Sequence, residues 1–368
     1  MRHYPIQKIA TVLEDLEGGG AERNLTNLMN QLVDKGMEID LVLVKMEGVF
    51  INELSPKINL VNLKAKSVYF SLLPLVKYFK NNKPSIILSS LDLMNMITLL
   101  AVRIAGKNTK SIIRVANMVS IQIRNPLKKT TEKIFMKYIY PWADHIIAVS
   151  KGVAQDLSQY AGISQDKITV IYNPVITKDL YIKMEEKPDH IWIINNHNNI
   201  ILAVGRLTQQ KNFPNLVRAF QIVREQIDAK LILLGEGELR GELESLAAKL
   251  GIKDHVSLPG FVPNPYTYMK RASVFVLSSD YEGLPTVLIE AMACGCPVVS
   301  TDCLSGPNEI LDGGKYGKLV PVKNAELLAQ AVLDTLDGEP KSVSPSWLNQ
   351  FTAEYSTNNF LKLLDKRV

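Results

Sequence analysis

Short apolar runs rich in β-branched residues alternate along the chain with longer segments whose apolar positions recur at helical spacing. In the first half, the apolar runs predict strands at 8–13, 38–44, 86–90, 110–115, 146–150 and 168–172. A second series is predicted at 200–204, 230–234, 255–258, 273–277, 298–300 and 318–320. Alternating strand–helix units of this kind favour an α/β fold, with parallel sheets covered by helices on both faces.

The periodicity is lost between residues 173 and 199, where Pro174, Pro188 and a polar run at 195–199 collect. A chain of 368 residues also exceeds what one core usually supports. We therefore predict two doubly wound, Rossmann-like domains facing across a cleft, at 1–175 and 199–349, joined by a linker at 176–198. A helical pattern over about 350–368 follows.

Two glutamates lie eight positions apart around a Gly-Leu-Pro turn. Glu282 follows the strand at 273–277, and Glu290 falls in the second turn of a helix that Pro285 begins. Open α/β sheets bind ligands at this carboxyl edge. Carboxylates suit sugar hydroxyls, and the free N–H groups of a helix start suit a diphosphate, which together favour a nucleotide sugar. The alternative is that both glutamates are solvated.

Glycines and cations add to this pattern. Gly18, Gly19 and Gly20 separate a strand from a helix, and Gly235 follows another strand, so the backbone there can approach an anion. Arg206 and Lys211 follow the strand at 200–204 and can converge on a diphosphate. The alternative is that both are ordinary surface residues, because exposed Lys and Arg side chains are common. The sequence contains no G-x-G-x-x-G, Walker or D-x-D motif.

Positive charge is concentrated in the first half. Residues 1–180 hold 23 Lys and Arg against 15 Asp and Glu, whereas the rest holds 19 against 22. The densest basic cluster comprises Arg124, Lys128, Lys129, Lys133 and Lys137, interleaved with Phe135, Met136, Tyr138 and Ile139. If this segment is a helix, its mixture of cationic and apolar side chains would suit a membrane interface. The alternative is that it is the solvated outer face of a helix. Nucleic acid is not an expected partner, because no recognised module occurs.

Composition excludes several classes of protein. With 46% hydrophobic and 21% charged residues, the chain is typical of soluble globular proteins. Cys294, Cys296 and Cys303 have no histidine nearby, so we expect buried thiols and no metal site. The N-terminal residues lack the pattern of a signal peptide, and the apolar stretch 85–106 is interrupted by charges, so we expect a cytoplasmic protein.

Four segments together resemble a known family. They are Gly-Gly-Gly-Ala-Glu-Arg at 18–23, Gly-Arg-Leu with Lys-Asn at 205–212, Leu-Pro-Gly-Phe with Asn-Pro-Tyr at 258–266, and the glutamate segment at 282–290. They resemble the retaining glycosyltransferases of family 4, which have a GT-B fold. The resemblance covers nearly the whole chain. It implies that the C-terminal helix crosses back to the N-terminal, acceptor-binding domain.

The resemblance also implies roles for residues. The catalytic residues would be Glu282, which holds the donor sugar, and Arg206 and Lys211, which stabilise the departing UDP without a metal or other cofactor. The implied donor-binding residues are Gly19, Gly20, Arg206, Lys211, Gly235, Phe261, Val262, Pro263, Gly283, Leu284, Pro285, Thr286 and Glu290. Glu290 would accept from the ribose hydroxyls, residues 261–263 would cover the base, and backbone groups of 283–286 would donate. The segments at 264–266 and 302–307 are similar to bacterial members that use UDP-sugars.

One position departs from the family. Many members carry a histidine after a strand of the first domain, where this chain has Arg114, Val115, Ala116, Asn117 and Met118. Arg114 and Asn117 are therefore candidates for contacts with the acceptor or sugar, and no base is assigned in that domain. His145 beside Asp144 is expected to be structural, because adjacent residues of an extended segment point apart.

The sequence thus predicts a bacterial glycosyltransferase that moves a hexose or N-acetylhexosamine from a UDP-sugar to a glycan or lipid-linked acceptor. The acceptor would belong to surface polysaccharide, lipopolysaccharide or glycoprotein glycan assembly at the inner face of the cytoplasmic membrane. Two alternatives stay open: a UDP-sugar 2-epimerase, and a non-catalytic subunit that binds nucleotide sugar.

Overall fold

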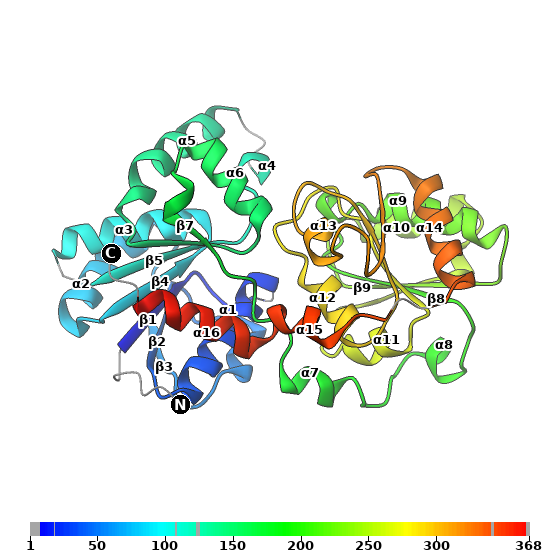
Figure 1. Cartoon of the computed structure of the whole chain (residues 1–368), viewed down its shortest axis with the longest axis horizontal. Helices are drawn as coiled ribbons and strands as arrows, with labels where there is room; N and C mark the ends of the chain where they lie inside the picture. The colour runs from blue at the N-terminus through cyan, green and yellow to red at the C-terminus, as the bar shows by residue number, and fades with distance from the viewer. Residues whose placement is uncertain (1–7, 18, 107–108, 123–125, 340–341, 366–368) are drawn as a thin grey trace. The chain divides into compact units, whose positions relative to one another are not determined.

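The computed structural model describes residues 8–17, 19–106, 109–122, 126–339 and 342–365. The chain divides into two compact units. Unit 1 comprises residues 1–175 and 351–368, and unit 2 comprises residues 176–350. Each unit contains one parallel sheet with helices on both faces, as the sequence predicts (Figure 1).

Unit 1 is built on a seven-stranded sheet in the order β3-β2-β1-β4-β5-β6-β7. Its strands are β1 Lys8–Leu13, β2 Glu38–Leu43, β3 Asn59–Asn62, β4 Ile86–Ser90, β5 Lys110–Val115, β6 His145–Ala148 and β7 Ile168–Val170. Six of these match predicted runs, and edge strand β3 was missed because three of its four residues are exposed. The order reverses between β1 and β4, and such a switch point is where ligands bind in this architecture.

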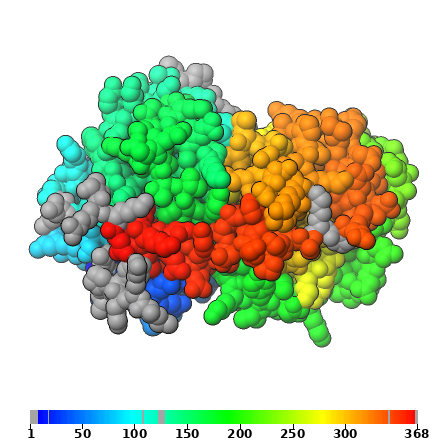
Figure 2. Space-filling model, viewed as in Figure 1, coloured from blue at the N-terminus to red at the C-terminus, as the bar shows by residue number. Residues whose placement is uncertain are grey.

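The helices of unit 1 cover both faces of the sheet because successive strand residues point to opposite sides. Ile9 and Leu13 pack with α1 (Gly20–Asp34) and the C-terminal helix α16 (Ala353–Asp365). Ala10 and Val12 pack with α2 (Leu72–Asn82) and α3 (Asp92–Ala105). The other helices are η1 Val49–Glu53, η2 Tyr69–Ser71, α4 Val119–Gln122, α5 Pro126–Ile139, η3 Tyr140–Trp142, α6 Lys151–Ala161 and η4 Gln165–Lys167. Figure 2 shows α16 in red on the surface of unit 1.

Unit 2 contains a six-stranded sheet in the order β10-β9-β8-β11-β12-β13. Its strands are β8 Ile200–Val204, β9 Lys230–Leu234, β10 Val256–Gly260, β11 Val274–Leu277, β12 Val298–Thr301 and β13 Lys318–Val320. Ala203 and Val276 join the core under α9 (Phe213–Arg224), α10 (Arg240–Lys249) and α14 (Ala325–Asp337). Other helices are η5 Gln209–Lys211, η6 Lys253–His255, α11 Tyr266–Arg271, α12 Thr286–Ala293, α13 Pro307–Ile310, α15 Pro345–Leu348 and η7 Asn349–Phe351, of which η7 ends at the first residue of the second segment of unit 1.

The predicted linker at 176–198 is corrected by the structure, because this segment belongs to unit 2. It forms two short helices, α7 Lys178–Lys183 and α8 Ile191–Ile194. The Asn264 amide donates to the carbonyl of Lys183 at 2.9 Å, and His190 Nε2 lies 2.9 Å from Ser257 Oγ. Helices of four to six residues are too short to show periodicity, so their contacts could not be read from the pattern.

No helix in the described parts of the chain combines the length and the apolar character that crossing a membrane requires.

Candidate functional site

Glu282 lies on the loop after β11 and is buried, with 7% of its surface exposed. Its Oε1 accepts hydrogen bonds from Lys211 Nζ at 2.6 Å and from Ser279 Oγ at 2.7 Å. Buried carboxylates are stable only when they are paired and hydrogen-bonded, and both conditions are met here. Glu282 is therefore not a solvated loop residue.

Lys211 reaches Glu282 because two loops are joined at the carboxyl edge of the sheet. Ser278 Oγ donates to the carbonyl of Lys211 at 2.8 Å, and the Asn212 amide donates to Asp280 Oδ1 at 2.7 Å. Gly205 leaves space for the lysine stem, since a Cβ at this position would lie 3.3 Å from Lys211 Cε. The cation and the carboxylate are thus fixed relative to each other in the free protein.

Glu290 is also buried, with 3% of its surface exposed. It lies in the second turn of α12, and its Oε1 accepts from the hydroxyl of Tyr266 on α11 at 3.3 Å. The helix begins at Thr286, one residue later than predicted, and Pro285 is its N-cap. Because proline lacks an N–H group, only Gly283, Leu284 and Thr286 of this turn can donate from the backbone.

Glycines let neighbouring loops approach closely at this edge. Gly235 has φ +137°, and a Cβ there would lie 2.0 Å from the carbonyl oxygen of Gly205. Gly306 has φ +93°, and a Cβ there would lie 2.4 Å from Pro285 Cδ. Ser305 Oγ also donates to the carbonyl of Gly283 at 2.8 Å. The loop at 302–307 therefore supports the turn between the two glutamates.

The other predicted donor residues of unit 2 are open to solvent to different degrees. Arg206 is exposed, and no described residue pairs with its guanidinium. In the loop after β10, Phe261 is 56% exposed, Pro263 is exposed and Val262 is half-buried. These side chains can contact a ligand without a rearrangement of the core.

The three cysteines are free and buried. Burial raises the pKa of the Cys294 and Cys303 thiols to about 12, so both are neutral at physiological pH. Among the residues that the structure describes, no group of three or more histidine, cysteine or carboxylate side chains is placed to hold a metal ion.

In unit 1, the glycine turn leads into α1. Gly19 is the N-cap and Gly20 the first helical residue, whereas Gly18 lies outside the described residues. The Glu22 carboxylate folds back over Gly19, where a Cβ would meet its Oε2 at 2.1 Å. The carboxylate is therefore placed at the start of the helix, near the backbone groups proposed to face an anion.

Arg114 lies near the end of β5, and only 5% of its surface is exposed. Its guanidinium donates to Ser90 Oγ at 2.9 Å and to Asn173 Oδ1 at 2.6 Å. Burial lowers the pKa of Arg114 to about 10. Asn117, on the loop that follows, is half-buried. The sequence did not identify Ser90 and Asn173 as partners, because both are distant from Arg114 along the chain.

Asp92, the first residue of α3, is a titratable group that the sequence did not single out as a site residue. The Tyr140 hydroxyl donates to its Oδ1 at 3.3 Å. Burial raises the pKa of this carboxyl to about 6. Asp144, by contrast, accepts from the backbone N–H and hydroxyl of Ser111 at 2.6 and 2.9 Å, which agrees with a structural role for that segment.

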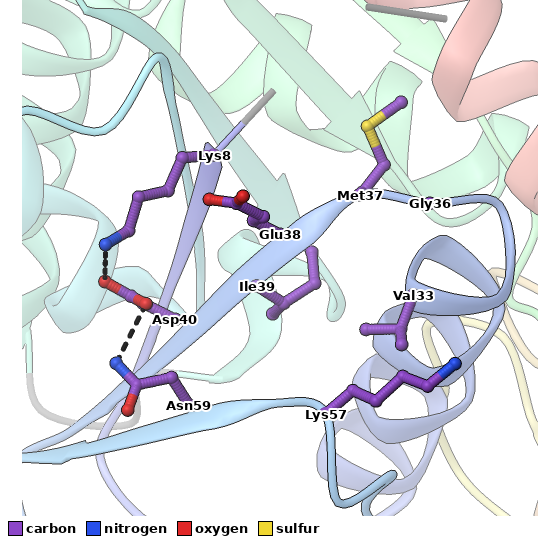
Figure 3. A pocket seen from close by; sticks show the side chains of 9 residues that line it. All are labelled: Lys8, Val33, Gly36, Met37, Glu38, Ile39, Asp40, Lys57 and Asn59. Carbon is purple, nitrogen blue, oxygen red and sulfur yellow. Dashed lines mark hydrogen bonds and ion pairs between the residues drawn. The ribbon is translucent and has the colours of Figure 1, made fainter. Parts of the chain in front are cut away.

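A hollow of about 520 Å³ lies at the opposite, amino edge of the sheet of unit 1 (Figure 3). Asp40 lines it and accepts from Lys8 and Asn59, which also line it, and from Tyr78. These groups satisfy one another, and none of the predicted site residues lines the hollow. It is not part of the candidate site.

Comparison with known proteins identifies both halves of the chain. Residues 18–179 match the family described as Glycosyltransferase Family 4, and residues 185–346 match Glycosyl transferases group 1. The chain is 33% identical, over 91% of each sequence, to the N-acetylgalactosamine-N,N'-diacetylbacillosaminyl-diphospho-undecaprenol 4-alpha-N-acetylgalactosaminyltransferase of Campylobacter jejuni. It is 26% identical, over 85% of each, to the lipopolysaccharide 1,6-galactosyltransferase of Salmonella typhimurium. Its structure is similar to that of Anabaena HepE in complex with UDP-glucose, with a TM-score of 0.82, 19% identity and coverage of 97% and 99%.

Proposed function

Because the chain belongs to glycosyltransferase family 4, with a GT-B fold, we propose that it transfers a hexose or N-acetylhexosamine from a UDP-sugar with retention of configuration. The acceptor would be a glycan or a lipid-linked saccharide in bacterial surface polysaccharide, lipopolysaccharide or glycoprotein glycan assembly. The observation that carries the proposal is the arrangement of the buried Glu282 and Glu290 with the half-buried Lys211 at one edge of the sheet of unit 2.

Glu290 and Glu282 divide the binding of the donor. We assign the ribose hydroxyls to Glu290, whose carboxylate Tyr266 orients, and the hydroxyls of the donor sugar to Glu282. A carboxylate accepts at several lone pairs, so Glu282 can keep its bonds to Lys211 and Ser279 and still accept from a sugar hydroxyl. Phe261, Val262 and Pro263 would cover the base, and Gly19, Gly20 and Gly235 would allow the backbone to approach the donor.

Arg206 and Lys211 would stabilise the leaving UDP. The Lys211 ammonium has three donors, of which one is bonded to Glu282, so the others can contact the diphosphate. Arg206 is exposed and can present its planar fork to the same group. Charge grows on the diphosphate as the glycosidic bond breaks, and these cations would stabilise it in the transition state without a resident cofactor or metal.

Retention follows if the acceptor hydroxyl attacks the anomeric carbon on the face from which UDP departs. The new carbon–oxygen bond forms as the bond to the diphosphate oxygen breaks. The hydroxyl proton passes to a phosphate oxygen of the leaving UDP, so the step balances without a base from unit 1.

The first test is a calorimetric titration with UDP, and with GDP as the control, in buffer that contains EDTA. Micromolar binding of UDP that Glu290→Ala abolishes in a folded protein is the expected result. A preference for GDP would change the class of donor, and a requirement for a divalent cation would refute the metal-independent assignment.

Turnover separates the transferase from the two alternatives. With a UDP-sugar and a membrane extract, we expect a glycosylated acceptor whose new linkage keeps the anomeric configuration of the donor. Epimerisation of UDP-N-acetylglucosamine without any acceptor would identify an epimerase. Binding of UDP without turnover in any extract would identify a non-catalytic subunit.

Helix α5 supports a further proposal, that the protein associates with the cytoplasmic face of the membrane. Met136 and Ile139 are buried against unit 1, whereas Ile134, Phe135 and Tyr138 are 49%, 54% and 64% exposed. The last three share one face, and the exposed Lys133 and Lys137 lie beside it. An apolar strip flanked by lysines fits the boundary of an anionic lipid surface. Arg124 of the predicted cluster lies outside the described residues, as does the side chain of Lys128.

Sedimentation with vesicles tests the association. The protein should bind vesicles that contain phosphatidylglycerol and not those of phosphatidylcholine alone, and Phe135→Ser with Tyr138→Ser should weaken binding. Ile194→Ser is the matched control, because Ile194 of unit 2 is also 54% exposed. Equal binding by all variants would rule out α5 as the contact.

A further inference from the structure

Unit 1 contains a buried cation whose hydrogen bonds account for only part of its capacity. A guanidinium carries five N–H donors. Arg114 uses two contacts, to Ser90 Oγ at 2.9 Å and to Asn173 Oδ1 at 2.6 Å, and both of these acceptors are neutral. Arg114 is nevertheless almost completely buried, with an exposed fraction of only 5%. Three donors are therefore left without a protein partner among the described residues.

No described carboxylate forms an ion pair with Arg114. The acid that acts on it electrostatically is Glu22, in the first turn of α1. The Glu22 carboxylate is folded toward Gly19 and is not bonded to the guanidinium. Burying a charge without a counter-charge costs several kcal/mol, and proteins usually avoid it. The lowered pKa of Arg114 has the same cause, because desolvation by burial outweighs the electrostatic effect of Glu22.

The position of Arg114 is one where this architecture binds ligands. Arg114 is the residue before the last of β5, Ser90 is the last of β4, and Asn173 follows β7. All three therefore lie at the carboxyl edge of the sheet. Leu91, which follows Ser90, has φ +74°, a conformation that is strained for leucine, and strained residues of this kind cluster at functional sites.

We propose that Arg114, held by Ser90 and Asn173, forms an anion-binding site in unit 1 that receives a phosphate group of a substrate. A planar guanidinium presents parallel N–H donors that match two phosphate oxygens. The bound anion would supply the direct ion pair that the described residues do not provide. The inference rests on the proposed function, because such a transferase meets two diphosphates: that of the nucleotide sugar and that of a lipid-linked acceptor.

Two titrations of the full-length protein distinguish these sources. UDP represents the donor, and geranyl diphosphate, a short soluble prenyl diphosphate, represents the acceptor. Loss of one bidentate charge-assisted contact should weaken binding by about 10-fold or more in Arg114→Gln. If Arg114→Gln weakens the binding of UDP but not of geranyl diphosphate, the site belongs to the donor. If it weakens the binding of geranyl diphosphate but not of UDP, the site belongs to the acceptor. Unchanged affinity for both would overturn the proposal.

The donor site must be tested separately. Lys211→Met should weaken UDP binding whether or not Arg114 contacts a phosphate. Unchanged UDP binding in Lys211→Met would therefore contradict the proposed function, whereas unchanged binding in Arg114→Gln would contradict only this inference. In the Lys211→Met background, inorganic pyrophosphate should still raise the melting temperature, and adding Arg114→Gln should remove that rise. The same rise in both variants would contradict the site.

A measurement on the unaltered side chain covers the case in which Arg114→Gln does not fold. In protein labelled with ¹⁵N-arginine, the buried Nε–H of Arg114 should give a separate NMR signal, assigned by its absence from Arg114→Lys. We expect pyrophosphate to shift it. A signal that stays in place while other signals show that pyrophosphate has bound would refute the proposal.

Discussion

The ion pair between Lys211 and Glu282 gives the sharpest prediction about stability. Its atoms are 2.6 Å apart, and the side chains are only 17% and 8% exposed. Lys211→Met leaves Glu282 charged and buried, which typically costs 3–5 kcal/mol. Because Glu282 keeps its bond from Ser279, we expect the lower value, about 3 kcal/mol. For a unit of this size each kcal/mol corresponds to about 2–4 °C, so the melting temperature should fall by roughly 6–12 °C.

The double variant Lys211→Met with Glu282→Gln should recover much of this loss, because it no longer buries an unpaired charge. Scanning calorimetry of the unaltered protein, the two single variants and the double variant measures the coupling free energy between the two side chains. Lys315→Met is the control, since Lys315 pairs with Asp312 at 3.5 Å and is 62% exposed, and exposed pairs contribute little. If the two single changes lower the melting temperature additively, the pair does not stabilise the site as we argue.

Three further changes test other parts of the structure. Tyr266→Phe should weaken UDP binding by about 3–10-fold in calorimetry by removing the bond to Glu290, whereas Tyr268→Phe, which loses a bond to Asp189, should not. Gly235→Ala should lower the melting temperature because its Cβ would clash with a carbonyl, whereas Gly241→Ala in α10 has open space and should not. Asp92→Asn should raise the melting temperature at pH 8 but not at pH 4. The folded pKa of about 6 exceeds the ordinary aspartate pKa of 3.8, so the folded state binds more protons between these two values, and stability falls as pH rises through this window. Equal effects of a change and its control, or an Asp92→Asn effect independent of pH, would contradict these arguments.

The strands were predictable because their signal is local. β1, β4, β5, β8, β9 and β13 have the predicted bounds, since runs of β-branched residues begin and end with each buried strand. Helix α12 was predictable in the same way, from Pro285, its apolar spacing and Gly295. The sequence predicted that Glu282 follows a strand and that Glu290 lies in the second turn of a helix, but it left open whether the two side chains are buried.

Features that depend on distant contacts were not predictable. The segment at 176–198 has no pattern of its own and is held by Asn264, which is 81 residues away from its partner Lys183. Arg114 was predicted as a candidate for contacts with the acceptor or sugar, but its partner Asn173, 59 residues away along the chain, is brought against it only by the fold. Tyr266 belonged to a segment noted for its likeness to UDP-sugar enzymes, yet its bond to Glu290 depends on how α11 packs beside α12.

The two units differ in how their charged groups are prepared for a ligand. In unit 2, Lys211 and Glu282 neutralise each other and are fixed by Ser278 and Ser279 before any ligand arrives. A substrate that binds there meets groups already oriented, so little ordering free energy is lost on binding. In unit 1, Arg114 is equally well held, but no residue in the described part of the chain forms an ion pair with it. An anion that reaches Arg114 would relieve an electrostatic cost that the free protein bears, so its binding should stabilise unit 1 more than its few contacts alone would predict.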